Sequence, residues 1–425
     1  MTLLLLCSLA LLQSEPVAQP DPVIISRSEY QLAVKAYEGR DYADFLDHAR
    51  RAQQLRPSHG GVIYGLASAY ALTGRRDSAI GMLNRFATLG YVADVAADSD
   101  FIALRGSPGY AGVRRALASN HTPIVRSTVA FTLPEKDLLT EGIAYDPLSK
   151  AYFVGSVHHR KILRVAGDGT VSEFVPAARD GMWAPLGMKV DAGRKALWVA
   201  VAGVPQMRDH SPGDLGRSGI YRFDLATGKL TGRFLIRDRA PHVLGDLTLA
   251  PNGDVYSSDS RAPMLWRVRA GADSIERFLE SPLLLSAQGL AVTPDGRSLY
   301  LADYSRGVLR VDLVTRRVAL LPCRASVLPL GIDGLYLVGG RLIGIQNGIE
   351  PHRVVRLTLD ARGDSLIGME VLERLHPSYA EPTLGVVVGG NLFYIANSQW
   401  ERFGETAEIA HPGELQRPTI LRLRL

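Results

Sequence analysis

The sequence predicts a mainly β fold, a six-bladed β-propeller that follows a small α-helical domain. Three observations predict this fold: a repeated strand that contains an arginine, a repeated strand that opens on glycine or aspartate, and an unpaired strand that can close the ring. Several short strands repeated at roughly 40 to 50 residues are typical of propeller blades, which pack around a central channel.

Two strand patterns occur six times each. The first joins two apolar residues, an arginine and another apolar residue, at 162–165, 220–223, 265–268, 308–311, 354–357 and 420–423. The second opens on Gly or Asp and precedes each copy of the first, at 142–145, 187–190, 246–249, 289–292, 334–337 and 385–388. A strand of β-branched and aromatic residues lies between them, and the turn at 251–254 is typical of a tight hairpin.

The ends of the repeat indicate how the ring closes. Blades one to five each have a fourth strand after the arginine strand, but only Arg424 and Leu425 follow the sixth copy. The apolar segment 129–133 lies just before blade one and has no other partner. We expect this segment to complete blade six, because a closed ring leaves no exposed sheet edge.

The chain before the propeller divides into three parts. An apolar run at 3–12, too short to span a bilayer, predicts a signal peptide at 1–18 and an exported protein, periplasmic or secreted. Residues 27–118 repeat apolar side chains at helical spacing. A linker at 119–126 leads into the propeller at 127–425.

The helical region resembles one and a half to two tetratricopeptide repeats, because its turns recur near the period of about 34 residues of those repeats. The resemblance implies either docking as a spacer or binding of a protein partner. The net charge of +5 over 425 residues indicates no nucleic-acid partner, and no segment predicts a membrane span.

The first residue of each inner strand is expected to point toward the channel axis at one face of the propeller. These entry positions are Glu141, Leu186, Gly245, Gln288, Asp333 and Leu384, and Asp246 follows the third. Carboxylates away from bulk water are costly unless they are paired, so a cation would explain their convergence. Carboxylate and amide oxygens suit Ca²⁺, and no pair of thiolates or histidines at fixed spacing indicates zinc.

Three segments around these residues resemble the gluconolactonase/regucalcin-like family of calcium-dependent six-bladed propellers: 141–147, 288–296 and 333–335. In that family, a Glu, two Asn and an Asp that open blades one, three, four and five bind the metal. The resemblance implies that Glu141 and Asp333 are ligands, with Gln288 in place of one Asn and Gly245-Asp246 in place of Asn-Asp. It also implies hydrolysis of a small lactone or ester, with Asp333 as a ligand and as the base or nucleophile.

The longest connections lie on the same face as the entry positions, at 201–219, 346–353 and 397–418. Long insertions on one face usually serve binding or catalysis. They contain His210, His352 and Trp400, which we expect to contact the substrate. His242 lies three residues before an entry position, and we expect it to be a catalytic residue that assists proton transfer.

Two other interpretations stay open. The changes at two of the four family ligand positions also fit a non-catalytic propeller, either a scaffold or a module that binds a small ligand. A third interpretation is a metal-free enzyme similar to the strictosidine-synthase-like propellers. Bound metal would favour the calcium-dependent hydrolase over the non-catalytic propeller, and turnover that survives chelation would favour the metal-free enzyme.

Overall fold

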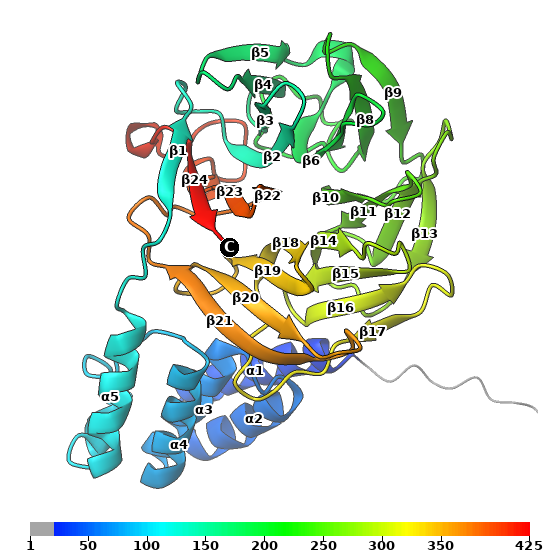
Figure 1. The fold of residues 1–425 in the computed structure, drawn as a ribbon. Coiled ribbons are helices and arrows are strands. Elements are labelled where there is room, and N and C mark those ends of the chain that lie inside the picture. Colours follow the sequence, from blue (N-terminus) through cyan, green and yellow to red (C-terminus); the bar gives the residue numbers. More distant parts are fainter. Residues whose placement is uncertain (1–20) are drawn as a thin grey trace, which may run out of the picture.

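The computed structural model describes residues 21–425 and contains six four-stranded antiparallel sheets around a common axis (Figure 1). The predicted six-bladed β-propeller is therefore confirmed. The predicted signal peptide at 1–18 lies outside the described residues.

Five blades follow the chain in order from the inner to the outer strand. Blade one contains β2 (Thr140–Asp146), β3 (Ala151–Ser156), β4 (Lys161–Val165) and β5 (Val171–Val175). Blade two contains β6 (Ala184–Asp191), β7 (Ala196–Ala202), β8 (Ser218–Asp224) and β9 (Leu230–Leu235). Blade three contains β10 (Leu244–Leu249), β11 (Val255–Asp259), β12 (Met264–Val268) and β13 (Glu276–Glu280). Blade four contains β14 (Ala287–Val292), β15 (Ser298–Asp303), β16 (Gly307–Asp312) and β17 (Val318–Leu320). Blade five contains β18 (Ile332–Val338), β19 (Arg341–Gln346), β20 (Arg353–Leu359) and β21 (Leu366–Arg374).

Blade six is built from both ends of the propeller. Its strands are β22 (Gly385–Val388), β23 (Asn391–Ile395), β24 (Thr419–Arg424) and, on the outside, β1 (Thr128–Thr132). β1 pairs with β24 so that Thr128 faces Arg422 and Thr132 faces Thr419. The predicted closure of the ring is confirmed, and the first strand covers the edge that the last strand would expose.

Apolar side chains fill the space between neighbouring sheets. Phe153 of blade one and Met188 of blade two, for example, belong to one buried cluster. The repeated arginines lie on the sheet surface, where Arg267 stands over the ring of Phe278 with 4.9 Å between guanidinium carbon and ring centroid. Arg222 stands likewise over Trp198, whereas Arg310 and Arg356 pair with carboxylates, so the repeated arginines share a place on the sheet surface and differ in their partners.

The helical domain precedes the ring. It contains α1 (Pro22–Glu38), α2 (Tyr42–Leu55), α3 (Gly60–Leu72), α4 (Arg76–Thr88), a 3₁₀ turn η1 (Ser99–Leu104) and α5 (Pro108–Asn120). The side chains of Asp21 and Asp41 cap α1 and α2 by accepting hydrogen bonds from backbone N–H groups of their first turns. The helical hairpins are as expected, and their resemblance to tetratricopeptide repeats stays a prediction.

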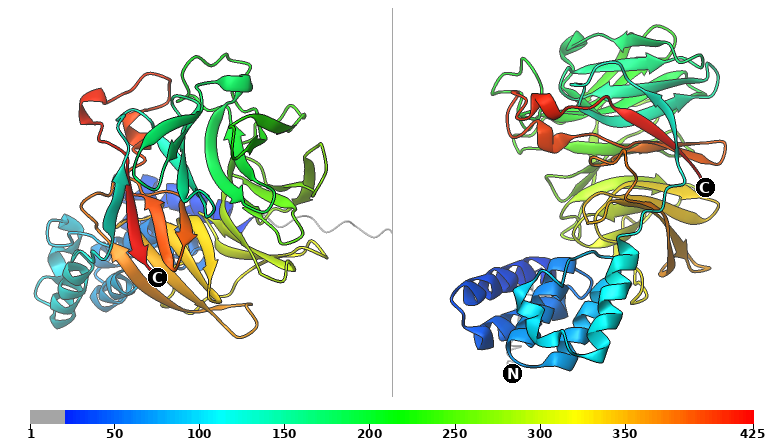
Figure 2. Two further views of the ribbon diagram at one scale, coloured as in Figure 1. Left: turned by 45° about the horizontal axis from the view of Figure 1, so that its top comes forward. Right: turned by 90° about the vertical axis from the view of Figure 1, so that its left-hand side faces the viewer.

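The helical domain packs against blades four and five (Figures 1 and 2). Leu328 and Leu330 of the propeller belong to the apolar cluster of the helices. Arg353, at the start of β20, is fully buried and donates hydrogen bonds to the carbonyl of Leu89 at 3.3 Å. Its Nε donates to Oε1 of Gln346 at 2.7 Å, so a propeller side chain holds the end of α4.

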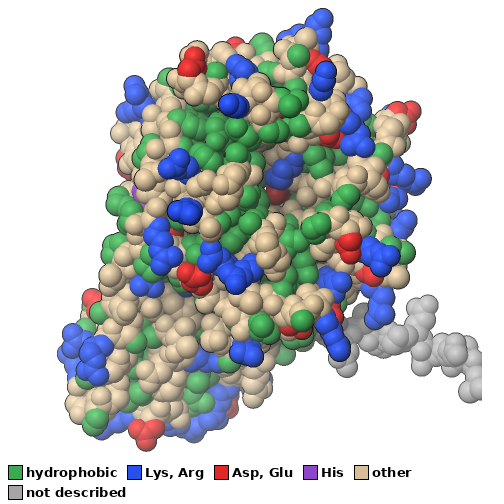
Figure 3. Space-filling view, in the orientation of Figure 1, with side chains coloured by type: hydrophobic (Ala, Val, Ile, Leu, Met, Phe, Trp, Pro, Cys, Tyr) green, Lys and Arg blue, Asp and Glu red, His purple; other side chains and the backbone are tan. Residues whose placement is uncertain are grey.

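The surface seen in Figure 3 carries scattered Lys and Arg side chains among acidic and apolar ones, and it is hollowed near the centre of the ring. Within residues 21–425, no helix is both long and apolar enough to cross a bilayer.

Candidate active site at the entry face of the channel

Glycines let the inner strands of neighbouring blades approach closely at the channel. A Cβ atom on Gly142 would lie 2.0 Å from the carbonyl oxygen of Leu186, and one on Gly289 would lie 2.3 Å from that of Asp333. A Cβ on Gly187 would lie 2.4 Å from Oδ1 of Asp246. Because each glycine directly follows an entry position, these contacts bring entry positions of successive blades side by side.

Glu141 and Asp333 lie in this ring without a basic partner. Oε2 of Glu141 accepts a hydrogen bond from Nε1 of Trp400 at 2.7 Å, and Oδ2 of Asp333 accepts one from Nδ2 of Asn347 at 2.9 Å. Within residues 21–425, no ion pair involves either carboxylate, although Asp333 is only 6% exposed. Loss of water and the negative charge of Asp333 raise the pKa of Glu141 well above its ordinary value.

The same causes act on Asp333. Burial, together with the charges of Asp246 and Glu381, raises the pKa of Asp333 to about 7 even though Asn347 donates a hydrogen bond to it. The pKa of Glu141 thus responds to the charges of Asp333 and Glu381, and that of Asp333 to the charges of Asp246 and Glu381, as expected for acids that face one channel.

Asp246 is held differently from the other two acids. Its Oδ1 accepts hydrogen bonds from Nζ of Lys189 at 3.1 Å and from the Leu247 N–H at 2.8 Å. Its Oδ2 is buried and has no hydrogen-bond partner among the described residues. One oxygen of Asp246 is therefore neutralised by a lysine, while the other is left for a further ligand.

The side chain of Gln288 extends toward the space beside Gly245, which has no side chain. The amide oxygen of Gln288 lies 3.6 Å from the place that a Cβ on Gly245 would occupy. Its Nε2 donates to Oγ of Ser286 at 3.3 Å, which directs the amide oxygen away from that serine. The longer side chain of Gln288 thus extends toward the space that the absent side chain of Gly245 leaves.

Sequence reasoning missed Glu381, which lies in the loop before β22. Its Oε2 accepts a hydrogen bond from the Trp400 N–H at 3.0 Å. Burial and the charge of Glu401 raise the pKa of Glu381 to about 7. The signal was available: Glu381 lies three residues before the entry position Leu384, the same spacing that drew attention to His242.

His242, the predicted catalytic histidine, is enclosed by two carboxylates and a tryptophan. Its ring is 1% exposed and holds two carboxylates, with Nδ1 2.6 Å from Oδ2 of Asp259 and Nε2 2.7 Å from Oδ1 of Asp238. Trp266 packs edge-on against it and also donates to Asp259. Both nitrogens are engaged, so His242 anchors the entrance of blade three, and its role in proton transfer stays a prediction.

The three predicted substrate-binding residues have different surroundings. Trp400 contacts Glu141 directly, as described above. His352 lines a cavity of about 390 Å³ together with Glu381, so it lies where a substrate could reach the acids. Nδ1 of His210 lies 2.7 Å from the carbonyl oxygen of Met207 in its own loop. The described contacts do not connect it to the axial acids, which are Glu141, Asp246, Asp333 and Glu381.

The cavity of about 390 Å³ reaches Glu381, whereas Glu141, Asp246 and Asp333 are not part of its lining. It is lined by Glu350, His352, Leu375, His376, Tyr379, Ala380, Glu381, Gln399, Glu401 and Arg402. Polar and charged side chains predominate, and the volume falls within the range of small-molecule sites.

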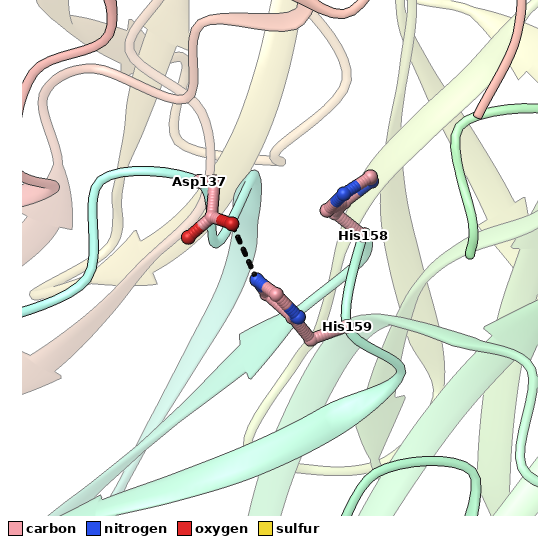
Figure 4. Close-up of side chains that lie close together, drawn as sticks. All are labelled: Asp137, His158 and His159. Atoms are coloured by element: carbon pink, nitrogen blue, oxygen red, sulfur yellow. Dashed lines mark ion pairs between the residues drawn. The ribbon is translucent and has the colours of Figure 1, made fainter. Parts of the chain in front are cut away.

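A second group of side chains could hold a metal, and it lies on blade one (Figure 4). Ligand atoms of Asp137, His158 and His159 lie within 4.8 Å of one another. Oδ2 of Asp137 is 3.0 Å from Nε2 of His159, and Nδ1 of His158 is 2.8 Å from the carbonyl oxygen of Gln206. Two imidazoles and a carboxylate suit a transition metal, whereas the axial oxygens suit calcium.

The axial donors fit a calcium ion. They are carboxylate and amide oxygens from four blades, and the unpartnered Oδ2 of Asp246 supplies an acceptor that the protein leaves unsatisfied. Among residues 21–425, the axial carboxylates are not among the groups of three whose ligand atoms all lie within 4.8 Å. Oxygens that bind one Ca²⁺ at about 2.3 to 2.6 Å lie at most about 5 Å apart, so a bound ion would draw these carboxylates closer together.

No protein-family model and no curated protein matches the sequence. Similar solved structures include a gluconolactonase from Xanthomonas campestris, at 17% identity and a TM-score of 0.47, covering 71% of this chain and 94% of that one. The calcium-binding protein regucalcin from Agrobacterium tumefaciens is 16% identical with a TM-score of 0.47, covering 69% and 93%. A virginiamycin B lyase from Staphylococcus aureus is 14% identical with a TM-score of 0.47, covering 69% and 83%. The neighbours thus include gluconolactonase- and regucalcin-like propellers, and we base the function on this chain's own side chains.

Proposed function

We propose that this protein is an exported, calcium-dependent hydrolase that opens a small lactone or ester at the entry face of the channel. The observation that carries the proposal is the gathering of Glu141, Asp246, Asp333 and Glu381, of which Lys189 neutralises only one. Negative side chains in a partly dehydrated site repel one another, and a bound cation relieves that repulsion. Export rests on the apolar run at 3–12.

The calcium ligands in this proposal are Glu141, Asp333, the amide oxygen of Gln288 and Oδ2 of Asp246. When bound there, calcium would supply Lewis-acid chemistry, polarising the substrate carbonyl and stabilising the negative charge on its oxygen.

The protein's own residues move the protons. As water adds to the carbonyl carbon, Asp333 accepts the proton that the water loses. Glu381 donates a proton to the leaving alkoxide, so the ring opens to a hydroxy acid and no further reactant is needed. Asn347 fixes Asp333 through its 2.9 Å hydrogen bond, and Trp400 links Glu141 to Glu381 by donating to both.

Activity measurements with and without metal test the proposal. A panel of small lactones and aryl esters is assayed with the purified protein and with the Asp333→Asn variant. We expect turnover that calcium supports and chelation removes, and a loss of at least about 100-fold in Asp333→Asn. Cooperative thermal unfolding of the variant serves as the control for folding. An active Asp333→Asn protein would refute the role of Asp333.

A second candidate, a non-catalytic module that binds a small ligand, is favoured by the ion pair between Lys189 and Asp246. This pair already occupies one oxygen of a predicted calcium ligand. Calcium binding without turnover of any substrate in the panel would support this candidate. Turnover that persists after exhaustive chelation would instead support a metal-free enzyme.

A further inference from the structure

A cavity of about 780 Å³ lies between the helical domain and the propeller. Its helical wall comes from α1, the connection between α2 and α3, the first turn of α3 and residues 91–93. Its propeller wall comes from residues 304–305, Leu330 and residues 348–350. The helical domain packs on blades four and five (Figure 2), and residues of both parts line the cavity.

Aromatic rings form much of the lining. They are Tyr30, Tyr64, Phe86, Tyr91 and Tyr304. Phe86 stacks on Tyr91 with ring centroids 4.9 Å apart and contacts Tyr64 at 5.4 Å. Such walls favour a flat aromatic or an alkyl group as the body of a ligand.

Two arginines line the same cavity without a carboxylate partner. Within residues 21–425, no ion pair involves Arg27 or Arg56. Nη2 of Arg27 donates to Oγ of Ser305 at 2.8 Å, whereas Nε of Arg56 is buried with no hydrogen-bond partner among those residues. Burial, and to a smaller extent repulsion from the charge of Arg27, lower the pKa of Arg56 to about 10. The only acidic side chain in the lining, Glu350, lies 3.2 Å from His352.

The N-terminus of α3 adds to this positive region. Gly60 and Gly61 open the 13-residue helix and line the cavity, and N–H groups in the first turn of a helix have no partner within the helix. The first turn contains no acidic side chain that would balance the helix dipole. Burial and the two arginines lower the pKa of His59, the N-cap residue, to about 4, so this histidine is neutral at pH 7.

We infer that this cavity binds an organic anion, a carboxylate or phosphate group carried on an aromatic or alkyl body. Arg27, Arg56 and the start of α3 hold the anionic group, and the aromatic rings hold the body. This inference goes beyond the proposed function, because it concerns binding and does not require catalysis. The cavity is nevertheless linked to the axial site: Tyr304 donates to Asn347, which in turn donates to Asp333.

Calorimetric titration of the whole protein tests the inference with four probes. Phenylacetate and phenylphosphonate carry the two anionic groups, phenylacetamide is a neutral counterpart of the first, and inorganic phosphate lacks the aromatic body. We expect both aromatic anions to bind at least about tenfold more tightly than phenylacetamide, because charged hydrogen bonds are lost with the amide. Inorganic phosphate is expected to bind more weakly than phenylphosphonate.

The variant Arg56→Gln is expected to weaken binding of both aromatic anions at least about tenfold. Arg277→Gln is the matched control, because it removes the same charge from an exposed position beside Glu280 on blade three. Equal binding of phenylacetate and phenylacetamide by the wild-type protein would overturn the inference without any variant. No binding of either anion at millimolar concentration, or full affinity in Arg56→Gln, would overturn it as well.

Discussion

At the scale of single residues, the acids of the axial site differ in the groups that balance their negative charge. Lys189 neutralises one oxygen of Asp246, whereas Glu141 and Asp333 have only neutral donors, Trp400 and Asn347. Unpaired buried charges are destabilising, so Glu141 and Asp333 lower the free energy of unfolding of the metal-free protein.

The stability of the metal-free protein should therefore depend on pH. The pKa of Asp333 is raised by burial to about 7, so the folded state binds its proton more tightly than the unfolded state does. Because this pKa is raised on folding, the contribution of Asp333 to stability is greatest below pH 4 and falls as the pH rises toward 7. We expect Asp333→Asn to unfold at a higher temperature than the wild type at pH 8, with a smaller difference at pH 4.5. Thermal denaturation in the presence of a chelator measures the two unfolding temperatures. An equal difference between variant and wild type at both pH values would contradict the prediction.

Lys189→Met tests the compensation of Asp246. The variant leaves a carboxylate that is 1% exposed without its cation, so we expect a loss of about 3 kcal/mol in the free energy of unfolding without metal. Calcium should restore more stability to this variant than to the wild type, because Asp246 then depends on the ion alone. Chemical denaturation with and without calcium measures both effects. A variant whose stability calcium leaves unchanged would count against Asp246 as a ligand.

At the scale of elements, the start of β1 is the point where the ring is fastened. Glu373 on β21 is fully buried and accepts hydrogen bonds from the N–H groups of Arg126 and Ser127, both at 3.0 Å. Tyr394 on β23 donates to the same carboxylate at 2.9 Å. One side chain of blade five thus ties the strand that completes blade six.

We expect Glu373→Gln to destabilise the propeller by about 2 to 4 kcal/mol, because hydrogen bonds to a buried charge are replaced by a neutral amide. Glu370→Gln on the same strand is the control, since Glu370 is about half exposed and pairs with Arg356 on the surface. That change should cost less than about 1 kcal/mol. Urea denaturation gives both values, and equal losses would contradict the fastening role.

Sequence patterns predicted the elements better than their contacts. Alternating apolar residues and hairpin turns are local signals, so the strands, the six blades and the closure by β1 could be predicted. The pair of Lys189 and Asp246 joins residues 57 positions apart in different blades, and no local pattern indicates it. The partners of His242 could not be predicted for the same reason, because Asp238 and Asp259 come together only when blade three folds.

At the scale of the whole molecule, the two domains form one body around Arg353. Its guanidinium donates to the carbonyl of Leu89, and its Nε donates to Gln346, whose Nε2 donates to the carbonyl of Leu330 at 2.7 Å. The helical pattern of residues 27–118 could be predicted from the sequence, but its place on blades four and five could not. It depends on Arg353, which the sequence presents as one strand arginine among many.

Replacing Arg353 with methionine should loosen this contact. The change leaves the carbonyls at the end of α4 unpaired, so we expect the helical domain to detach more readily and the linker at 119–126 to be cleaved several times faster by a protease. Limited proteolysis with mass spectrometry measures the cleavage rate. The exposed change Arg277→Gln is the control, and an unchanged rate in Arg353→Met would contradict the docking role.

Calcium titration followed by calorimetry tests most directly whether the axial acids hold a cation. We predict that the metal-free wild-type protein binds Ca²⁺ and unfolds at a clearly higher temperature when calcium is present, and that Asp333→Asn loses both effects. A wild-type protein that neither binds Ca²⁺ nor gains stability from it, or an Asp333→Asn variant that binds it equally well, would contradict the account.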